Sequence, residues 1–280
     1  PASIGTRIQS RLAPMLSLVR RVRGGSKAVV YRLTKAALHR FGYDFEIFPR
    51  SRRDAHAVHN ADKRFYREWR SPSPVWAPWR GEPDFRQAYD GVEPYTVVSG
   101  DRCQILYRLA NQALSVDGDF AECGVYRGGT ALLLSRVLVG HQRSLHLFDS
   151  FEGLPAPDPE RDPDLEQGVF KATSVQAVEA LLDGFSGPLR IHRGWIPSTF
   201  DGLEDARFAF VHVDVDLYRS TLDCLEYFYP RLSAGGIVVF DDYGFPAARG
   251  EKDAVDEFFS GRPEAPLALP TGQAIVTKLP

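Results

Sequence analysis

The sequence predicts an α/β protein built on a doubly wound, mostly parallel sheet of seven strands, preceded by a basic helical extension. From about residue 100 onward, helical and strand-like segments alternate, which is typical of a parallel sheet with helices on both faces. Several strand-like runs are apolar and β-branched and then end in aspartate. Buried parallel strands have this composition, and their carboxyl ends form the edge at which open α/β sheets bind ligands.

The chain of 280 residues divides into three expected parts. Residues 1–70 form a basic helical arm, residues 71–94 an irregular bridge rich in proline and aromatic residues, and residues 95–280 the main domain. Helices are expected near 100–115, 129–139, 174–183, 218–230 and 251–260. Strands are expected at 119–123, 145–148, 189–192, 208–213 and 236–240, with two short ones around Leu267 and at 274–277.

Composition and charge exclude several classes of protein. Residues 1–54 hold twelve basic and three acidic residues, a balance of +9, so the net charge of −2 leaves −11 for the rest. An acidic main domain argues against binding of nucleic acid. Three separated cysteines give no zinc pattern and favour a reducing compartment, and no apolar run reaches the ~18 residues of a membrane span. We therefore expect a cytoplasmic protein.

The basic arm has two interpretations. Ile8, Leu12, Leu16 and Val19 recur at helical spacing with arginines around them. Such a helix packs on the main domain or on a partner subunit, or else it lies on an anionic membrane surface. We favour packing and expect a homo-oligomer, with peripheral membrane contact as the alternative.

A glycine-rich turn follows the first strand of the main domain. The run ECGVYRGGT, from Glu122 to Thr130, lets the backbone approach a ligand closely beside a helix N-terminus. It departs from the GxGxxG pattern of dinucleotide-binding proteins. The second strand ends at Asp149, which is placed to accept hydrogen bonds from a ribose, although a capping role is the alternative. The acidic loop 156–167 that follows is either a lid over the substrate or an ordinary solvated loop.

Two aspartate pairs end later strands of the same sheet. Asp214 and Asp216 lie in HVDVDLY, and Asp241 and Asp242 lie in VVFDDYG. Four carboxylates at one edge repel one another unless a cation, protons or hydrogen bonds offset the charge, and Mg²⁺ suits oxygen ligands of this kind. The alternative is that each pair caps the following helix. If the strand continues regularly, His212, Asp214 and Asp216 point to one face.

Five motifs in order, ECGVYRGGT, LFDSFEGLP, HVDVDLYRST, LSAGGIVVFDDYG and AVDEFF, resemble the macrocin O-methyltransferase family. The resemblance begins near residue 95 and does not cover the basic arm. It implies a class I, Rossmann-like fold that uses S-adenosylmethionine and a divalent metal to methylate sugar hydroxyls. The acceptor would then be a glycosylated natural product or a surface saccharide.

The resemblance also implies roles for single residues. It assigns the metal to Asp214, Asp241 and Asp242, the general base to Asp216, and cofactor contacts to Glu122, Gly124 and Asp149. We extend the cofactor set to Tyr126, Gly128, Ser150 and Gly194, and keep His212 as a backup base. Catechol-type methyltransferases place a lysine three residues after the first metal aspartate, but Leu217 stands there in this chain.

Two rival functions remain at this point. A nicotinamide-dependent oxidoreductase uses a similar sheet, but it would lack its glycine fingerprint and leave four aspartates without a role. A non-catalytic binding module is disfavoured because a carboxylate stands at every expected metal position.

Overall fold

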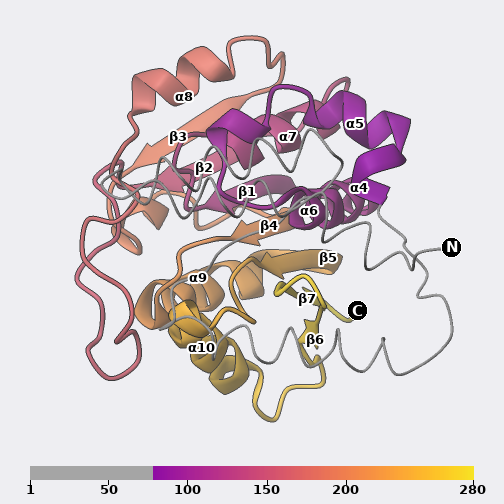
Figure 1. The fold of residues 1–280 in the computed structure, drawn as a ribbon. Helices are drawn as coiled ribbons and strands as arrows, with labels where there is room; N and C mark the ends of the chain where they lie inside the picture. Colours follow the sequence, from indigo (N-terminus) through magenta and orange to yellow (C-terminus); the bar gives the residue numbers. More distant parts are fainter. Residues whose placement is uncertain (1–77) are drawn as a thin grey trace, which may run out of the picture. The chain divides into compact units, whose positions relative to one another are not determined.

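A computed structural model describes residues 78–280 of the chain, and the described residues form one seven-stranded sheet with helices on both faces (Figure 1). The strands are β1 (Asp119–Cys123), β2 (Leu145–Asp149), β3 (Leu189–Arg193), β4 (Phe208–Val213), β5 (Leu232–Phe240), β6 (Leu267–Ala268) and β7 (Ala274–Thr277). Their order across the sheet is β3-β2-β1-β4-β5-β7-β6. All pairings from β3 to β5 are parallel, and β7 is antiparallel to both of its neighbours. The predicted fold class is confirmed.

The helices of the main domain also lie where the alternating pattern predicts them. They are α6 (Gly100–Ala113), α7 (Gly129–Val137), α8 (Val175–Leu181), α9 (Tyr218–Arg231) and α10 (Arg249–Phe259). Three 3₁₀ turns, η2 (Glu93–Tyr95), η3 (Ser198–Phe200) and η4 (Pro246–Ala248), lie in the connections.

The prediction of an irregular bridge is wrong for the part that the structure describes. Two short helices, α4 (Pro78–Gly81) and α5 (Pro83–Tyr89), lie where the bridge was expected. Proline at the first helical position does not break a helix, because the amide that it lacks would have no partner there. Phe85 and Tyr89 of α5 are buried, and Trp79 packs against the same cluster, so this segment belongs to the core.

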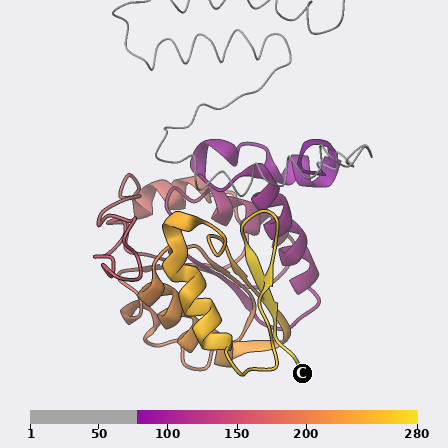
Figure 2. The same cartoon turned by 60° about the horizontal axis from the view of Figure 1, so that its bottom comes forward.

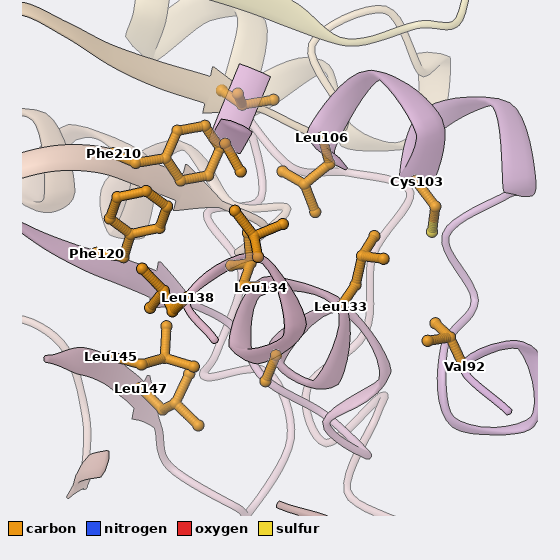
Figure 3. Packing of buried hydrophobic residues seen from close by; sticks show 14 of the residues in the cluster. Val92, Cys103, Leu106, Phe120, Leu133, Leu134, Leu138, Leu145, Leu147 and Phe210 are labelled. Carbon is orange, nitrogen blue, oxygen red and sulfur yellow. The ribbon is translucent and has the colours of Figure 1, made fainter. Parts of the chain in front are cut away.

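One face of the sheet packs against α6 and α7, while α5 packs on these two helices and α8 adds Val178 to the same hydrophobic cluster. The strands place large apolar side chains on this face, among them Phe120 of β1, Leu145 of β2 and Phe210 of β4. They share a cluster with Leu106 of α6 and Leu134 of α7 (Figure 3). All five of these side chains are fully buried. Because side chains alternate along a strand, this face takes every second residue.

The other face takes the intervening residues and packs against α9 and α10. Cys123, Phe148 and Val213 point this way and share a cluster with Phe228 of α9 and Val255 of α10. The terminal hairpin of β6 and β7 lies beside α10 at the edge of the sheet (Figure 2).

The strand order reverses between β1 and β4. The chain runs outward from β1 through β2 to β3, then returns to β4 on the other side of β1. Ligands of open α/β sheets bind at such a switch point, beyond the carboxyl ends of the strands. The glycine turn after β1 and the aspartates after β4 and β5 therefore lie at the expected place.

Several predictions concern residues outside the described range. The basic arm of residues 1–70 and the first part of the bridge, residues 71–77, lie there, so packing and membrane contact of the arm both stay predictions. In the described range, no helix has the length and apolar character that crossing a membrane requires.

Candidate functional site

The turn after β1 is organised by the carboxylate that ends β2. Asp149 Oδ2 accepts hydrogen bonds from the backbone amides of Val125 and Tyr126, at 2.7 and 2.9 Å. Its Oδ1 accepts one from the amide of Phe151 at 2.6 Å, which leaves this oxygen free to accept a further bond. None of these three amides belongs to a helix, so the alternative that Asp149 caps a helix is wrong. Its carboxylate instead fixes the turn after β1 beside the cavity.

Gly124 brings this turn against the strand that carries the aspartates. It has a φ of 84°, and a Cβ added there would lie 1.7 Å from the carbonyl oxygen of Asp214. Only glycine fits this approach. The expected cofactor turn and the first expected metal ligand are therefore in direct backbone contact.

The four aspartates converge at the ends of β4 and β5. The backbone amide of Asp214 donates to Cys123, and that of Asp241 donates to Val213, so the sheet ladder extends to both residues. Ligand atoms of Asp214, Asp216 and Asp242 lie within 4.8 Å of one another, and so do those of His212, Asp214 and Asp241. Asp214 belongs to both groups, and the arrangement suits a hard divalent cation.

Asp216 reaches this cluster by a different route from the predicted one. Strand β4 ends at Val213, so the expectation of a regular strand through Asp216 is wrong. Asp216 has a φ of 58°, and the amide of Leu217 donates to the carbonyl of Val215 at 2.6 Å around it. This tight turn brings the carboxylate back toward Asp242 in the cavity.

Burial and mutual repulsion dominate the electrostatics of the cluster. Burial, followed by the charges of Asp241 and Asp242, raises the pKa of Asp214 well above its usual range. Burial and the neighbouring Asp242 raise the pKa of Asp216 in the same way. Burial also raises the pKa of Asp242. Carboxylates with raised pKa values are those that a bound cation would stabilise in the charged form.

Asp241 is the exception because protein groups already offset its charge. Burial opposes its ionisation, but contacts with His212 and with the guanidinium of Arg102 lower its pKa overall. Arg102 Nη1 also lies 3.3 Å from Asp242 Oδ1, and the guanidinium stacks over the ring of Phe245 at 4.7 Å. The Nε2 amide of Gln273 donates to Asp241 Oδ1 at 2.8 Å.

His212 lies behind the carboxylates, between Asp241 and Glu122. Its Nδ1 is 2.9 Å from Glu122 Oε1, and its Nε2 is 3.5 Å from Asp241 Oδ1. All three side chains are buried. Burial lowers the pKa of His212, but its contacts with Asp241 and Glu122 outweigh burial and raise the pKa to about 10. Because the imidazole is buried and does not line the cavity, the geometry disfavours the backup-base interpretation.

The structure brings most of the predicted residues to one cavity. Those that line it are Gly124, Tyr126, Asp149, Ser150, Gly194, Asp214, Asp216, Asp241 and Asp242. Glu122, Gly128 and His212 do not line it. Gly128 is instead the N-cap residue of α7, with a φ of 84°, and Glu122 contacts His212.

Sequence reasoning missed Arg102, Gln273 and Glu251. Glu251 is fully buried in the first turn of α10 and accepts the backbone amide of Asp242 at 2.8 Å. The excess of acidic residues at this edge of the sheet indicates that a basic side chain should lie nearby. No sequence motif identifies Arg102 as that side chain, because it lies 139 residues from Asp241.

Apolar side chains line the remaining walls of the cavity. Val97 and Trp195 do so while remaining 61% and 39% exposed, and Phe170 packs edge-on against Tyr126. Aromatic faces of this kind stack against the apolar faces of sugars and purine rings. The cavity thus joins a carboxylate cluster, a glycine turn with a ribose-type acceptor, and aromatic walls.

Comparison with known proteins gives a family match over most of the described residues. The family model described as macrocin-O-methyltransferase (TylF) matches residues 77–265. The 8-demethyl-8-(2,3-dimethoxy-alpha-L-rhamnosyl)-tetracenomycin-C 4'-O-methyltransferase of Streptomyces olivaceus is 34% identical over 197 residues, which cover 64% of this chain and 74% of the relative. The mycinamicin III 3''-O-methyltransferase of Micromonospora griseorubida is 32% identical over 183 residues, covering 59% of this chain and 70% of the relative.

Solved structures agree with this result. The O-methyltransferase NovP superposes with a TM-score of 0.58 at 26% identity, covering 66% of this chain and 83% of NovP. The calicheamicin methyltransferase CalS11 superposes with a TM-score of 0.54 at 20% identity, covering 74% of this chain and 99% of CalS11, and shares the fold.

Proposed function

Because the chain belongs to the macrocin O-methyltransferase family and is an O-methyltransferase, we propose that it methylates a sugar hydroxyl with S-adenosylmethionine and Mg²⁺. The acceptor is a glycosylated natural product or a surface saccharide. The convergence of four aspartates and the Asp149 turn on one cavity is the observation that carries this proposal.

S-adenosylmethionine fits the part of the cavity between β1 and β2. When bound, it supplies an electrophilic methyl group. Asp149 Oδ1 keeps one acceptor position for a ribose hydroxyl, and Gly124 lets the backbone approach the ligand without a side chain. Ser150 and Gly194 line the same end of the cavity.

Mg²⁺ fits the cluster of Asp214, Asp241 and Asp242. Two of these carboxyls have raised pKa values in the absence of a cation, and all three line the cavity. A bound cation would lower the pKa of a substrate hydroxyl and fix its orientation. Arg102 already offsets part of the charge of Asp241, so it limits the repulsion that the cluster must bear.

Asp216 is the proposed general base. It lines the cavity beside Asp242, and its raised pKa brings it closer to that of a proton acceptor working at neutral pH. Its carboxylate would accept the proton of the sugar hydroxyl, so that the oxygen could take the methyl group of bound S-adenosylmethionine as the methyl–sulfur bond breaks and S-adenosylhomocysteine leaves. His212 is less well placed for this role, because it is buried behind the carboxylates and does not line the cavity.

The names of the relatives narrow the acceptor class. The name of the Streptomyces olivaceus enzyme gives its substrate as a rhamnosyl compound. Both relatives are named as O-methyltransferases. The nicotinamide-dependent oxidoreductase is now disfavoured by family membership as well as by the missing glycine fingerprint.

A methyl-transfer assay tests the proposal directly. The full-length protein is incubated with labelled S-adenosylmethionine and a panel of rhamnosylated and other glycosides, with and without excess chelator. We expect label in a glycoside fraction and loss of that label in chelator. Undiminished transfer in chelator would refute the metal role, and transfer only to non-sugar phenols would refute the acceptor class.

Binding of S-adenosylmethionine can be tested separately. Asp149→Ala removes the acceptor of the ribose and of the Val125 and Tyr126 amides, so affinity should fall by at least about 1.5–3 kcal/mol, the scale for hydrogen bonds to a charged group. Isothermal titration calorimetry checks this prediction. The exposed neighbour Glu152 provides a matched control as Glu152→Gln, whose dissociation constant should stay near that of the parent protein.

A further inference from the structure

Helix α9 begins two residues after the proposed base, and it lacks a cap of its own. Its N-cap residue is Leu217, which offers no side-chain acceptor, and its first turn contains no acidic residue. The first amides of a helix need acceptors because they have no partner within the helix. The amide of Tyr218, the first residue of α9, is one of these groups.

The acceptor comes from the acidic loop, 56 residues earlier in the chain. Asp162 Oδ1 accepts the Tyr218 amide at 3.0 Å, and Asp162 Oδ2 accepts the amide of Asp158 at 3.2 Å. Asp162 is only 2% exposed, whereas Asp164 in the same loop is exposed. One carboxylate thus ties the acidic loop to the start of α9.

Gly250, the second residue of α10, makes room for this carboxylate. A Cβ added at Gly250 would lie 1.8 Å from Asp162 Oδ1 and 2.9 Å from the Tyr218 amide nitrogen. The neighbouring Arg249 donates to the carbonyls of Glu160 and Arg161, which holds the loop against α10. These contacts hold residues 158–162 against α9 and α10, while the lid and the solvated-loop interpretations of the whole loop both stay predictions.

We propose that Asp162 is a positioning residue that fixes the turn of Asp216, a role that rests on the proposed function of Asp216 as base. Asp216 has a φ of 58°, in the region that residues other than glycine rarely adopt. Such a conformation persists only when the surrounding structure holds it. Two hydrogen bonds hold this turn. The Leu217 amide donates to the carbonyl of Val215, and the Tyr218 amide donates to the carboxylate of Asp162.

Three variants of the acidic loop test this role. Asp162→Leu removes both acceptors at similar volume, and we expect kcat to fall about 10- to 100-fold, the scale for misplacing a catalytic group. The KM for S-adenosylmethionine should stay within about twofold. Asp162→Asn keeps one acceptor oxygen and should restore most of kcat. Asp164→Asn should behave as the parent protein. Equal losses in the Leu and Asn variants, or parallel losses of kcat and cofactor affinity, would overturn the proposal.

A backbone variant isolates the hydrogen bond itself. Tyr218→Pro deletes the amide that Asp162 accepts at a position where proline suits a helix, and Tyr218→Ala removes the same side chain but keeps the amide. The Asp162→Leu change should lower kcat in the alanine background and have little further effect in the proline background. Equal effects in both backgrounds would contradict the proposal.

Amide hydrogen exchange keeps this test separate from the proposed reaction. Exchange in the segment 215–221 should accelerate at least about tenfold in Asp162→Leu and remain unchanged in Asp164→Asn. Unchanged exchange in Asp162→Leu would overturn the capping role. If the parent protein methylates no glycoside while exchange responds as expected, the proposed function fails and the capping contact stands.

Discussion

Asp216 differs from the other three aspartates of the site in its backbone. Asp214 and Asp241 extend the ladders of their strands through their amides, and Asp242 is held by Glu251. Asp216 instead sits in a tight turn with a positive φ, between the end of β4 and the start of α9. Asp216 is therefore the one of these four carboxylates whose position depends on a strained turn and not on a strand ladder or on Glu251.

A pair of variants separates the proposed general base, Asp216, from the proposed metal ligands. Asp216→Asn should lower turnover about 10²–10⁴-fold, the usual contribution of a positioned proton acceptor. Affinity for Mg²⁺ should change much less, and calorimetry with the metal alone measures it. Asp214→Asn is the matched comparison and should lose metal affinity together with activity. If Asp216→Asn loses metal affinity to the same degree, Asp216 is a ligand and the base lies elsewhere.

At the scale of the elements, the site depends on the close approach of the backbone after β1 to the backbone after β4. Gly124 follows β1 and touches the carbonyl of Asp214, which follows β4. The turn that would hold the cofactor therefore cannot move without moving a residue that would hold the metal. This contact couples the two binding functions through the backbone alone.

A glycine comparison tests that coupling. Gly140 has a φ of 83°, almost the same as the 84° of Gly124, but a Cβ at Gly140 would meet nothing within 4 Å. Gly140→Ala should therefore cost only the backbone strain, about 1–3 kcal/mol of unfolding free energy. Gly124→Ala should cost more and should weaken both S-adenosylmethionine and Mg²⁺ binding. Equal unfolding free energies with intact binding in both variants would contradict the close approach.

Most of these elements were predictable because their local signals agree with their final packing. The strand at 119–123 is buried on both faces, as expected for a parallel strand inside the sheet, and the helix at 218–230 has a periodicity that matches the face it buries. The two helices before residue 90 were missed because prolines were read as breakers, although Pro83 starts a helix. The turn at Asp216 was missed because a strand pattern does not reveal where the ladder stops.

At the scale of the whole molecule, a stack of aromatic rings lies on β2 and β3, at one edge of the sheet. His192 stacks on Phe148 at 4.4 Å, and His192 Nε2 lies 3.0 Å from His146 Nδ1. His146 Nε2 in turn lies 3.4 Å from Asp119 Oδ2. Burial, and then repulsion from His146, lowers the pKa of His192 to about 4.

This shift predicts a loss of stability in mild acid. Between pH 6.5 and 4 the unfolded chain binds a proton at His192 that the folded protein does not, so the free energy of unfolding should fall as the pH falls through this window. Because the ring is only half-buried, we expect on the order of 1–2 kcal/mol. Thermal unfolding at several pH values measures it, with His192→Gln as the non-titrating comparison. Parallel pH profiles for both proteins would rule out His192 as the cause.

The sequence predicts only part of the candidate site, because some of its contacts join residues that are far apart in the chain. The aspartates and the glycine turn lie at strand ends, so their local pattern places them at the edge of the sheet. Arg102, Gln273 and Glu251 reach the same carboxylates from other elements, and their contacts exist only once the layers have packed. No spacing along the chain encodes a contact of this kind.

The contact between Gln273 and Asp241 has a consequence for how the protein is made. Gln273 lies on the connection between β6 and β7, downstream of every other side chain at the site. During synthesis the chain leaves the ribosome from its N-terminus, so the parallel strands can begin to assemble before this residue emerges. Until it does, Asp241 lacks its amide partner. A nascent chain can therefore hold its parallel strands while Asp241 still lacks this hydrogen bond, and the carboxylate gains its full set of partners only after the connection between β6 and β7 has formed.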